Sequence, residues 1–160
     1  MLNNQQNGFS AIEMMVVVAV IAILAMIAIP SSVERIAKEH VLAAIPLADI
    51  AKDPIAAQWK LLKTLPMDNK EAGLPAPDKV VSNFISAVAI KDGVINMTFG
   101  NKANPKLKGK ILSIRPAVIE EAQIVPIAWV CGYAKPPNKM LLLGANQTNI
   151  EDRYLPLACK

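Results

Sequence analysis

An uninterrupted apolar run at residues 9–29 constrains the fold of this chain more than any other feature of the sequence. The run contains one charged residue, Glu13, and its apolar residues would cover every side of a helix. At about 1.5 Å per residue such a helix is about 31 Å long, which matches the hydrocarbon core of a bilayer. Because the remaining residues could hardly enclose it, the sequence predicts a helix that lies in a membrane.

The residues before this run differ from those of an ordinary secretory signal. Residues 1–8 contain no Lys or Arg, and no separate small-residue cleavage site follows the apolar core. A glycine, Gly8, instead comes directly before the run. A carboxylate in a membrane costs about 2.5–3.5 kcal/mol on insertion scales, so Glu13 is a candidate functional residue.

The charge and the cysteines leave several classes of protein open. A net charge of +4 is too small to demand a nucleic-acid partner. The two cysteines, Cys131 and Cys159, fit free thiols in a cytosolic protein or one disulfide in an exported protein. The N-terminal segment therefore decides how the cysteines are interpreted.

The N-terminal motif resembles a known processing signal. Gly8 is followed by Phe9, by Ser-Ala-Ile-Glu ending at Glu13, by an apolar stretch and by Pro30. This arrangement resembles the class III signal of type IV pilins and related pseudopilins. Two features depart from the family: Ala11 replaces the common leucine, and the leader lacks basic residues. Membrane topology then rests on the start amine and on the export machinery rather than on a positive-inside bias.

The resemblance implies a precursor in three parts. Residues 1–8 are a leader that a prepilin peptidase removes between Gly8 and Phe9, and the same enzyme methylates the new N-terminus on Phe9. Residues 9–30 are the transmembrane and assembly helix, and residues 31–160 are a periplasmic or extracellular head. The implied location is the inner membrane of a Gram-negative bacterium, followed by an extracellular fibre.

The pattern after the apolar run predicts a helix that changes character. Apolar residues recur at helical spacing from residue 31, so the helix becomes amphipathic. Pro46 is expected to kink it. Asp53 is expected to cap a new helix that has Pro54 at its first position and that Pro66 ends. The long helix is thus predicted to be bent or interrupted at residues 46–54.

Beyond a proline-marked loop at residues 66–79 the pattern turns to strands. Lys91-Asp92-Gly93 separates two β-rich runs and is typical of a hairpin turn. Pro116 and Pro126 are expected to confine two later strands to edges or ends. The predicted strands are residues 84–90, 94–99, 110–115 and 124–131. A helix before a meander of about four antiparallel strands predicts an α+β head, with the helix covering one face of the sheet.

The head also resembles type IV major pilins. The similar segments are Glu71 to Leu74, the Gly93 to Gly100 hairpin, Asn104-Pro105 through Gly109-Lys110, Trp129-Val130-Cys131 and Tyr154-Leu155-Pro156. Pseudopilins of secretion systems usually lack the terminal cysteine pair. Export implies that Cys131 and Cys159 form a disulfide, which in the chain-entropy account is worth about 3.6 kcal/mol.

Neither a catalytic nor a metal-binding motif is found in the sequence. His40 is the only histidine and is interpreted as a packed or solvated helix residue rather than a ligand. No His/Cys cluster has metal-ligand spacing, and no phosphate loop or nucleophile motif occurs. The sequence therefore predicts a non-enzymatic protein without a cofactor or bound metal.

Several lysines follow the predicted hairpin without an intervening acid. They are Lys102, Lys106, Lys108 and Lys110, and Arg115 comes after them. A solvated edge that discourages sheet pairing is the favoured interpretation, and contact with DNA phosphates is the alternative. Of the aromatic residues only Phe99 is near enough in sequence to stack on bases, and this disfavours DNA.

These features lead to one favoured function and two alternatives. The favoured one is a major pilin that polymerises with itself through its apolar helix, with assembly dependent on Glu13 and Pro30. The family implies adhesion, twitching motility and DNA uptake for such a fibre, and as partners the peptidase, the membrane lipid and the pilus assembly machinery. The alternatives are a minor or competence pilin that binds DNA, and a secretion pseudopilin.

Overall fold

The computed structural model describes residues 8–160, apart from the side chains of residues 28–31. Most of the predicted leader, residues 1–7, thus lies outside the described residues. The chain divides into two compact units, Met1–Glu34 and Arg35–Lys160. We call the second unit the head.

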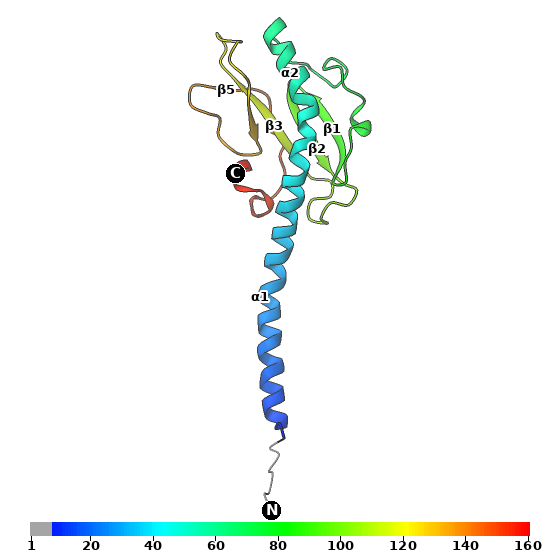
Figure 1. The fold of residues 1–160 in the computed structure, drawn as a ribbon, viewed down its shortest axis with the longest axis vertical. Helices are drawn as coiled ribbons and strands as arrows, with labels where there is room; N and C mark the ends of the chain where they lie inside the picture. Colours follow the sequence, from blue (N-terminus) through cyan, green and yellow to red (C-terminus); the bar gives the residue numbers. More distant parts are fainter. Residues whose placement is uncertain (1–7) are drawn as a thin grey trace, which may run out of the picture. The chain divides into compact units, whose positions relative to one another are not determined.

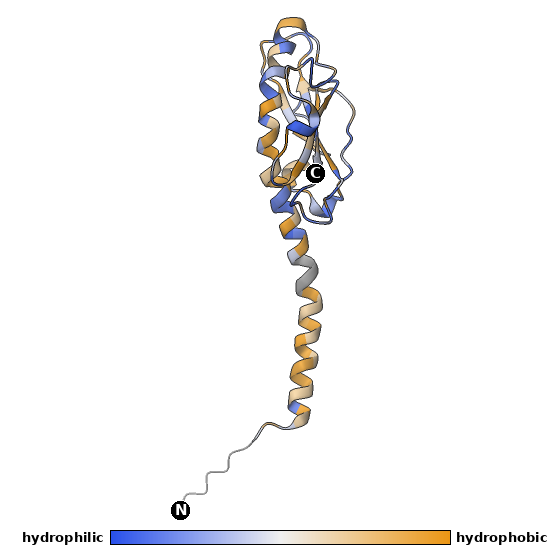
Figure 2. Cartoon of the chain, turned by 90° about the vertical axis from the view of Figure 1, so that its right-hand side faces the viewer, coloured by the Kyte–Doolittle hydropathy of each residue, from blue (hydrophilic) through white to orange (hydrophobic). Residues whose placement is uncertain are grey.

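Helix α1 runs from Ala11 to Ala44 and contains the whole apolar segment from its third residue onward. Every described side chain from residue 11 to residue 27 is exposed. Figure 2 shows the hydrophobic colouring along this part of the helix. Among the described residues, this is the one helix long and apolar enough to cross a membrane.

The expected interruption of the helix is confirmed, but it is shorter than predicted. Pro46 lies in a single 3-10 turn, Ile45–Ala48, between α1 and helix α2, Asp49–Leu62. A proline lacks the N–H that an α-helix needs and commonly marks such a turn. Helix α2 ends at Leu62, before Pro66, because Lys63 adopts a left-handed conformation with φ of 58°.

The prediction that Asp53 caps a new helix was wrong. Pro54 lies inside α2, which already begins at Asp49. The helix tolerates the lost hydrogen bond because Ala51, Ile55 and Trp59, at four-residue spacing, are all buried. Tertiary packing therefore outweighs the local capping signal.

The head contains one antiparallel sheet in the order β1-β2-β3-β4, with a short β5 paired to β3 (Figure 1). The strands are β1 Ile85–Lys91, β2 Val94–Phe99, β3 Ile111–Val118, β4 Ala128–Cys131 and β5 Leu141–Leu142. The predicted hairpin is confirmed to within one residue. Strand β4 begins later than predicted, after Pro126, and β5 was not predicted.

Pro116 does not end a strand as predicted, because β3 continues through it to Val118. Pro116 pairs with Trp129 of β4 on one side, and on the other its carbonyl accepts a hydrogen bond from the Leu143 N–H at 2.9 Å. The N–H and C=O of one strand residue point to the same side. The missing N–H thus falls on the side of β5, which contains only Leu141–Leu142, so no ladder hydrogen bond to β4 is lost.

The two faces of the sheet are covered differently. Helix residues such as Val41 and Ile55 belong to one buried apolar cluster with sheet residues such as Met97 and Leu112. Elsewhere in the sheet, the buried Ser113 hydroxyl donates to Asn96 Oδ1 at 2.6 Å, and its backbone N–H donates to the Thr148 hydroxyl at 3.0 Å. Polar contacts therefore attach the segment before the C-terminus to β3.

The outer edge of β1 is covered by the preceding loop. The Asn69 side-chain amide donates to the Val88 carbonyl at 2.9 Å and to the Pro75 carbonyl at 3.0 Å. Its oxygen accepts the Ile90 N–H at 2.7 Å. Because Asn69 is itself buried, the loop at residues 66–79 is fixed against the strand.

The predicted disulfide between Cys131 and Cys159 is present in the structure. The Tyr133 N–H also donates to the Cys159 carbonyl at 2.9 Å. Between these contacts Gly132 has φ of 57°, and a Cβ on it would lie 2.5 Å from the Cys159 carbonyl oxygen. The disulfide and these contacts hold the C-terminus against the end of β4, and only glycine fits at the point of closest approach.

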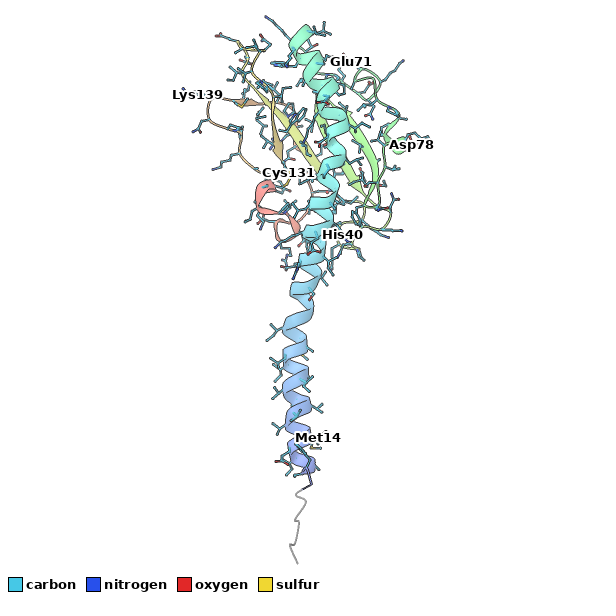
Figure 3. All side chains as sticks on the ribbon, viewed as in Figure 1. Met14, His40, Glu71, Asp78, Cys131 and Lys139 are labelled. Atoms are coloured by element: carbon cyan, nitrogen blue, oxygen red, sulfur yellow. A yellow bond between two sulfur atoms is a disulfide. The ribbon has the colours of Figure 1, made fainter. Side chains whose placement is uncertain are left out.

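The two opposite ends of the head are formed by different loops, and the candidate sites are located by the end at which they lie. At one end the β1–β2 turn lies beside the chain leaving α2, with the Gly93 N–H donating to the Pro66 carbonyl at 2.8 Å. Because β1, β2 and β3 are antiparallel neighbours, the loop between β2 and β3 lies at the other end. Figure 3 shows His40 at that end and Glu71 near the first.

Candidate assembly and processing sites

The predicted cleavage junction lies outside regular structure. Gly8 and Phe9 precede the first residue of α1, and Phe9 is 81% exposed. A Cβ added to Gly8 would meet nothing within 4 Å. The packing of the described chain therefore does not require a glycine at this position, and the predicted role of Gly8 in cleavage remains a prediction.

Glu13 takes part in a capping box at the start of α1. The Ser10 N–H donates to Glu13 Oε2 at 2.8 Å, and the Ile12 N–H donates to the Ser10 hydroxyl at 3.3 Å. These reciprocal bonds satisfy two backbone donors at the helix end, where the macrodipole also favours a carboxylate. The charge of Glu13 is thus partly compensated within its own helix.

The role of Ser10 in this contact was not predicted from the sequence. The signal was present, because Ser-Ala-Ile-Glu has the Ser-x-x-Glu spacing of a capping box. The other predicted assembly residue, Pro30, falls within α1, and its side chain is not among those described. Its role remains a prediction.

The apolar side chains of α1 from residue 11 to residue 27 have no cover within the described chain. Phe9, Ile12, Met15 and Ile27 are each exposed by more than two thirds. Burying one such side chain is worth about 1.5–3 kcal/mol, so many of them together strongly favour a covered state. Lipid or neighbouring apolar helices can supply that cover.

The lysines predicted as a group lie on a well-structured loop, residues 100–110, which we call the lysine loop. Every backbone N–H from Lys102 to Lys110 donates a hydrogen bond, Pro105 having none to donate. Leu107 is completely buried and anchors the loop in the core. Three of the predicted lysines, Lys102, Lys106 and Lys108, are exposed, whereas Lys110 is half-buried.

His40 connects the lysine loop to helix α1. Its Nδ1 accepts the Asn104 N–H at 3.0 Å, and its ring stacks on Phe84 with centroids 4.1 Å apart. The interpretation of His40 as a packed residue is thus confirmed. In the part of the chain that the structure describes, no group of three His, Cys, Asp or Glu side chains could hold a metal ion.

Arg115 does not belong with the lysines, although it follows them in sequence. It lies within β3, and its guanidinium donates to the Gly132 carbonyl at 3.2 Å. Its buried Nε has no partner among the described atoms. Burial lowers the pKa of the Arg115 guanidinium from its usual value, but arginine remains charged at physiological pH.

Comparison with known proteins agrees with this geometry. The chain matches the family described as pilin, a bacterial filament protein, over residues 37–160. It matches the prokaryotic N-terminal methylation motif over residues 3–29. Because the first match covers well over half of the sequence, the chain belongs to the pilin family.

Curated relatives extend over nearly the whole chain. The type IV major pilin protein PilE of Neisseria gonorrhoeae is 28% identical over 165 residues, which cover 99% of this chain and 96% of PilE. A fimbrial protein of Neisseria meningitidis serogroup A is 28% identical over 168 residues, with the same coverage. Fimbrial protein EcpC of Eikenella corrodens is 28% identical over 163 residues, which cover 100% of this chain and 94% of EcpC.

Proposed function

We propose that this chain is the major structural subunit of a type IV pilus. The observation that carries the proposal is the exposed apolar helix, which has Glu13 in its first turn and is followed in the chain by a disulfide-closed head. Such a helix requires apolar neighbours, and identical copies can supply them in a fibre. The names of the relatives, which include type IV major pilin proteins, support the same function.

Assembly would proceed from a membrane-anchored precursor. The apolar helix holds the precursor in the inner membrane of a Gram-negative bacterium, where a prepilin peptidase cuts before Phe9 and methylates it. The pilus machinery then transfers the helix from lipid into a bundle of identical helices. Glu13 guides this step, because its carboxylate can pair with the N-terminal amine of a neighbouring mature subunit and offset part of the burial cost of both charges.

Sheared surface fibres provide the direct test of this function. We expect mass spectrometry of the fibre protein to identify this chain as the most abundant component. A major pilin must dominate, because the fibre is a polymer of it, whereas a minor pilin or a pseudopilin would be scarce. A fibre made mainly of another subunit would contradict the proposal.

Processing has its own test, and it does not depend on abundance. The intact mass of the fibre subunit should equal that of the chain from Phe9 to Lys160 plus one methyl group, less the two hydrogens lost in the disulfide. The non-helical, exposed position of Gly8 and Phe9 supports access by the peptidase. Assembled subunits that retain residues 1–8 would refute this cleavage site.

Adhesion, twitching motility and DNA uptake are further activities that the family resemblance implies for such a fibre. We retain DNA binding as a second candidate because Lys102, Lys106 and Lys108 are exposed. The aromatic side chain considered for base stacking, Phe99, is only 1% exposed. This burial removes the stacking contribution that single-stranded DNA would need.

A further inference from the structure

We propose that the lysine loop binds the phosphate groups of anionic phospholipids in the membrane that anchors the precursor. This inference rests on the proposed membrane anchor and assigns a partner to a surface of the head. Three observations carry it: the charge of the loop, its rigid attachment, and its place at the end of the head where the chain enters from the apolar segment.

The positive charges of the lysine loop are not neutralised by ion pairs among the described residues. Lys102, Lys106 and Lys108 are exposed, and none of the ion pairs formed by the described residues includes them. Glu39, the acid on α1 at the start of the head, pairs with Arg35 at 3.1 Å. The three ammonium groups are thus available to an external anion.

The loop presents these lysines on a fixed backbone. Its hydrogen bonds extend from Lys102 to Lys110, and Asn104 alone accepts three of them, at its backbone carbonyl and its side-chain oxygen. The contact from Asn104 to His40 holds the loop against helix α1. A prearranged loop loses little conformational entropy when its lysines meet a surface.

A short stretch of chain tethers the lysine loop to the apolar run. His40, which holds the loop, follows Ile29 by only eleven residues. Even a fully extended stretch of that length spans at most about 40 Å. The tether thus keeps the loop near the surface of the membrane that holds the apolar run, and the long lysine side chains extend the reach of its charge.

The same observations favour lipid over DNA. Phe99 is buried and Phe84 is stacked on His40, so neither offers a free ring to a base. A lipid phosphate needs no aromatic partner, because juxtamembrane basic residues attract anionic lipid by charge alone. The loop also lies at the end of the head opposite the β1–β2 turn, the end at which the membrane-anchored segment joins.

Amine labelling of the full-length chain in lipid bilayers tests this contact. The chain is placed in nanodiscs of phosphatidylcholine alone, or of equal parts phosphatidylcholine and phosphatidylglycerol, and labelled with a limiting uncharged acylating reagent. We expect Lys102, Lys106 and Lys108 to react at least about threefold more slowly with phosphatidylglycerol, since each lysine near an anionic surface contributes about a fivefold preference. At about 0.5 M NaCl, where screening shortens the Debye length to about 4 Å, the difference should disappear.

Lysines elsewhere on the head are controls within the same molecule. Lys60, Lys70 and Lys135 are exposed and lie outside the loop, so their rates should be the same in both bilayers. A variant pair adds a matched control. Lys106→Glu with Lys108→Glu should restore the labelling of Lys102, whereas Lys60→Glu with Lys70→Glu should leave it slow.

Each other outcome overturns the proposal in a recognisable way. Equal rates in both bilayers, or equal slowing at the control lysines, exclude a specific lipid contact while leaving the anchor intact. Protection by added duplex DNA in phosphatidylcholine, without protection by phosphatidylglycerol, would assign the loop to DNA instead. A chain that does not enter the nanodisc overturns both this inference and the proposed anchor.

Discussion

Replacing Glu13 by alanine is expected to abolish fibres or make them sparse, while the precursor still enters the membrane. The substitution removes a charge whose burial costs about 2.5–3.5 kcal/mol, so insertion should be as efficient as in the wild type or better. It also removes the partner proposed for the N-terminal amine of a neighbouring subunit. Fibre yield by shearing, normalised to the amount of precursor in the membrane, measures the effect.

Two further variants separate the roles of this carboxylate. Glu13→Gln keeps a side-chain acceptor for the Ser10 N–H but removes the charge, so it should fail like the alanine variant if charge pairing drives assembly. Ser10→Ala removes the hydroxyl cap, at a cost of about 0.5–2 kcal/mol, and keeps the charge, so its fibres should persist. Normal fibre yield from both Glu13 variants would show that the carboxylate is dispensable.

Loss of the disulfide is expected to destabilise the head by about 3.6 kcal/mol, since the bond closes a loop with a sequence separation of 28. For a domain of this size that corresponds to a fall in Tm of about 10–15 °C. The double variant Cys131→Ser with Cys159→Ser is used because a single substitution would leave the other cysteine as a free thiol. Thermal unfolding of the full chain in detergent, followed by near-ultraviolet circular dichroism, measures the change.

Wild-type protein in a reducing agent is the matched comparison for that variant. Both samples lack the bond, and they should unfold at similar temperatures if the constraint itself is responsible. A double-serine variant as stable as the oxidised wild type would show that the contacts around Gly132 suffice to hold the C-terminus. Peptide mapping without reduction would then show whether the native protein carries the bond at all.

Local signals in the sequence predicted the elements that depend on local chemistry. The Lys91-Asp92-Gly93 turn fixed the hairpin, because a positive φ at Asp92 and Gly93 suits a tight turn. Pro46 indicated the helix break for a reason that is equally local, because proline lacks the N–H that an α-helix needs. The apolar run was likewise recognised without knowledge of distant contacts.

Elements that depend on distant contacts could not be predicted in this way. Strand β3 passes through Pro116 only because β5 is too short to need its N–H, and β5 itself contains two residues. Helix α2 continues through Pro54 because its apolar face is buried against the sheet. Tertiary structure thus outweighs the local proline signal in both elements, through hydrogen-bond geometry in β3 and through packing in α2.

The candidate sites likewise combine residues that were recognised from the sequence with contacts that were not. Glu13 was found from its isolation in an apolar run, while its bond to Ser10 was missed although its spacing is visible in the sequence. The lysines were found as a group, but their attachment through Asn104 to His40 spans 64 residues of sequence. Only the folded chain shows that Arg115 belongs to a different environment.

The amide of Asn69 has a consequence for how copies of this protein can join. By bonding to Val88 and Ile90 it occupies the outer edge of β1, where an incoming strand would otherwise add. At the opposite edge β4 is only four residues long, and the disulfide and the Tyr133 N–H hold the C-terminus beside its end. Crowded subunits in a membrane therefore have little opportunity to aggregate through their sheets, and ordered polymerisation is left to the helix.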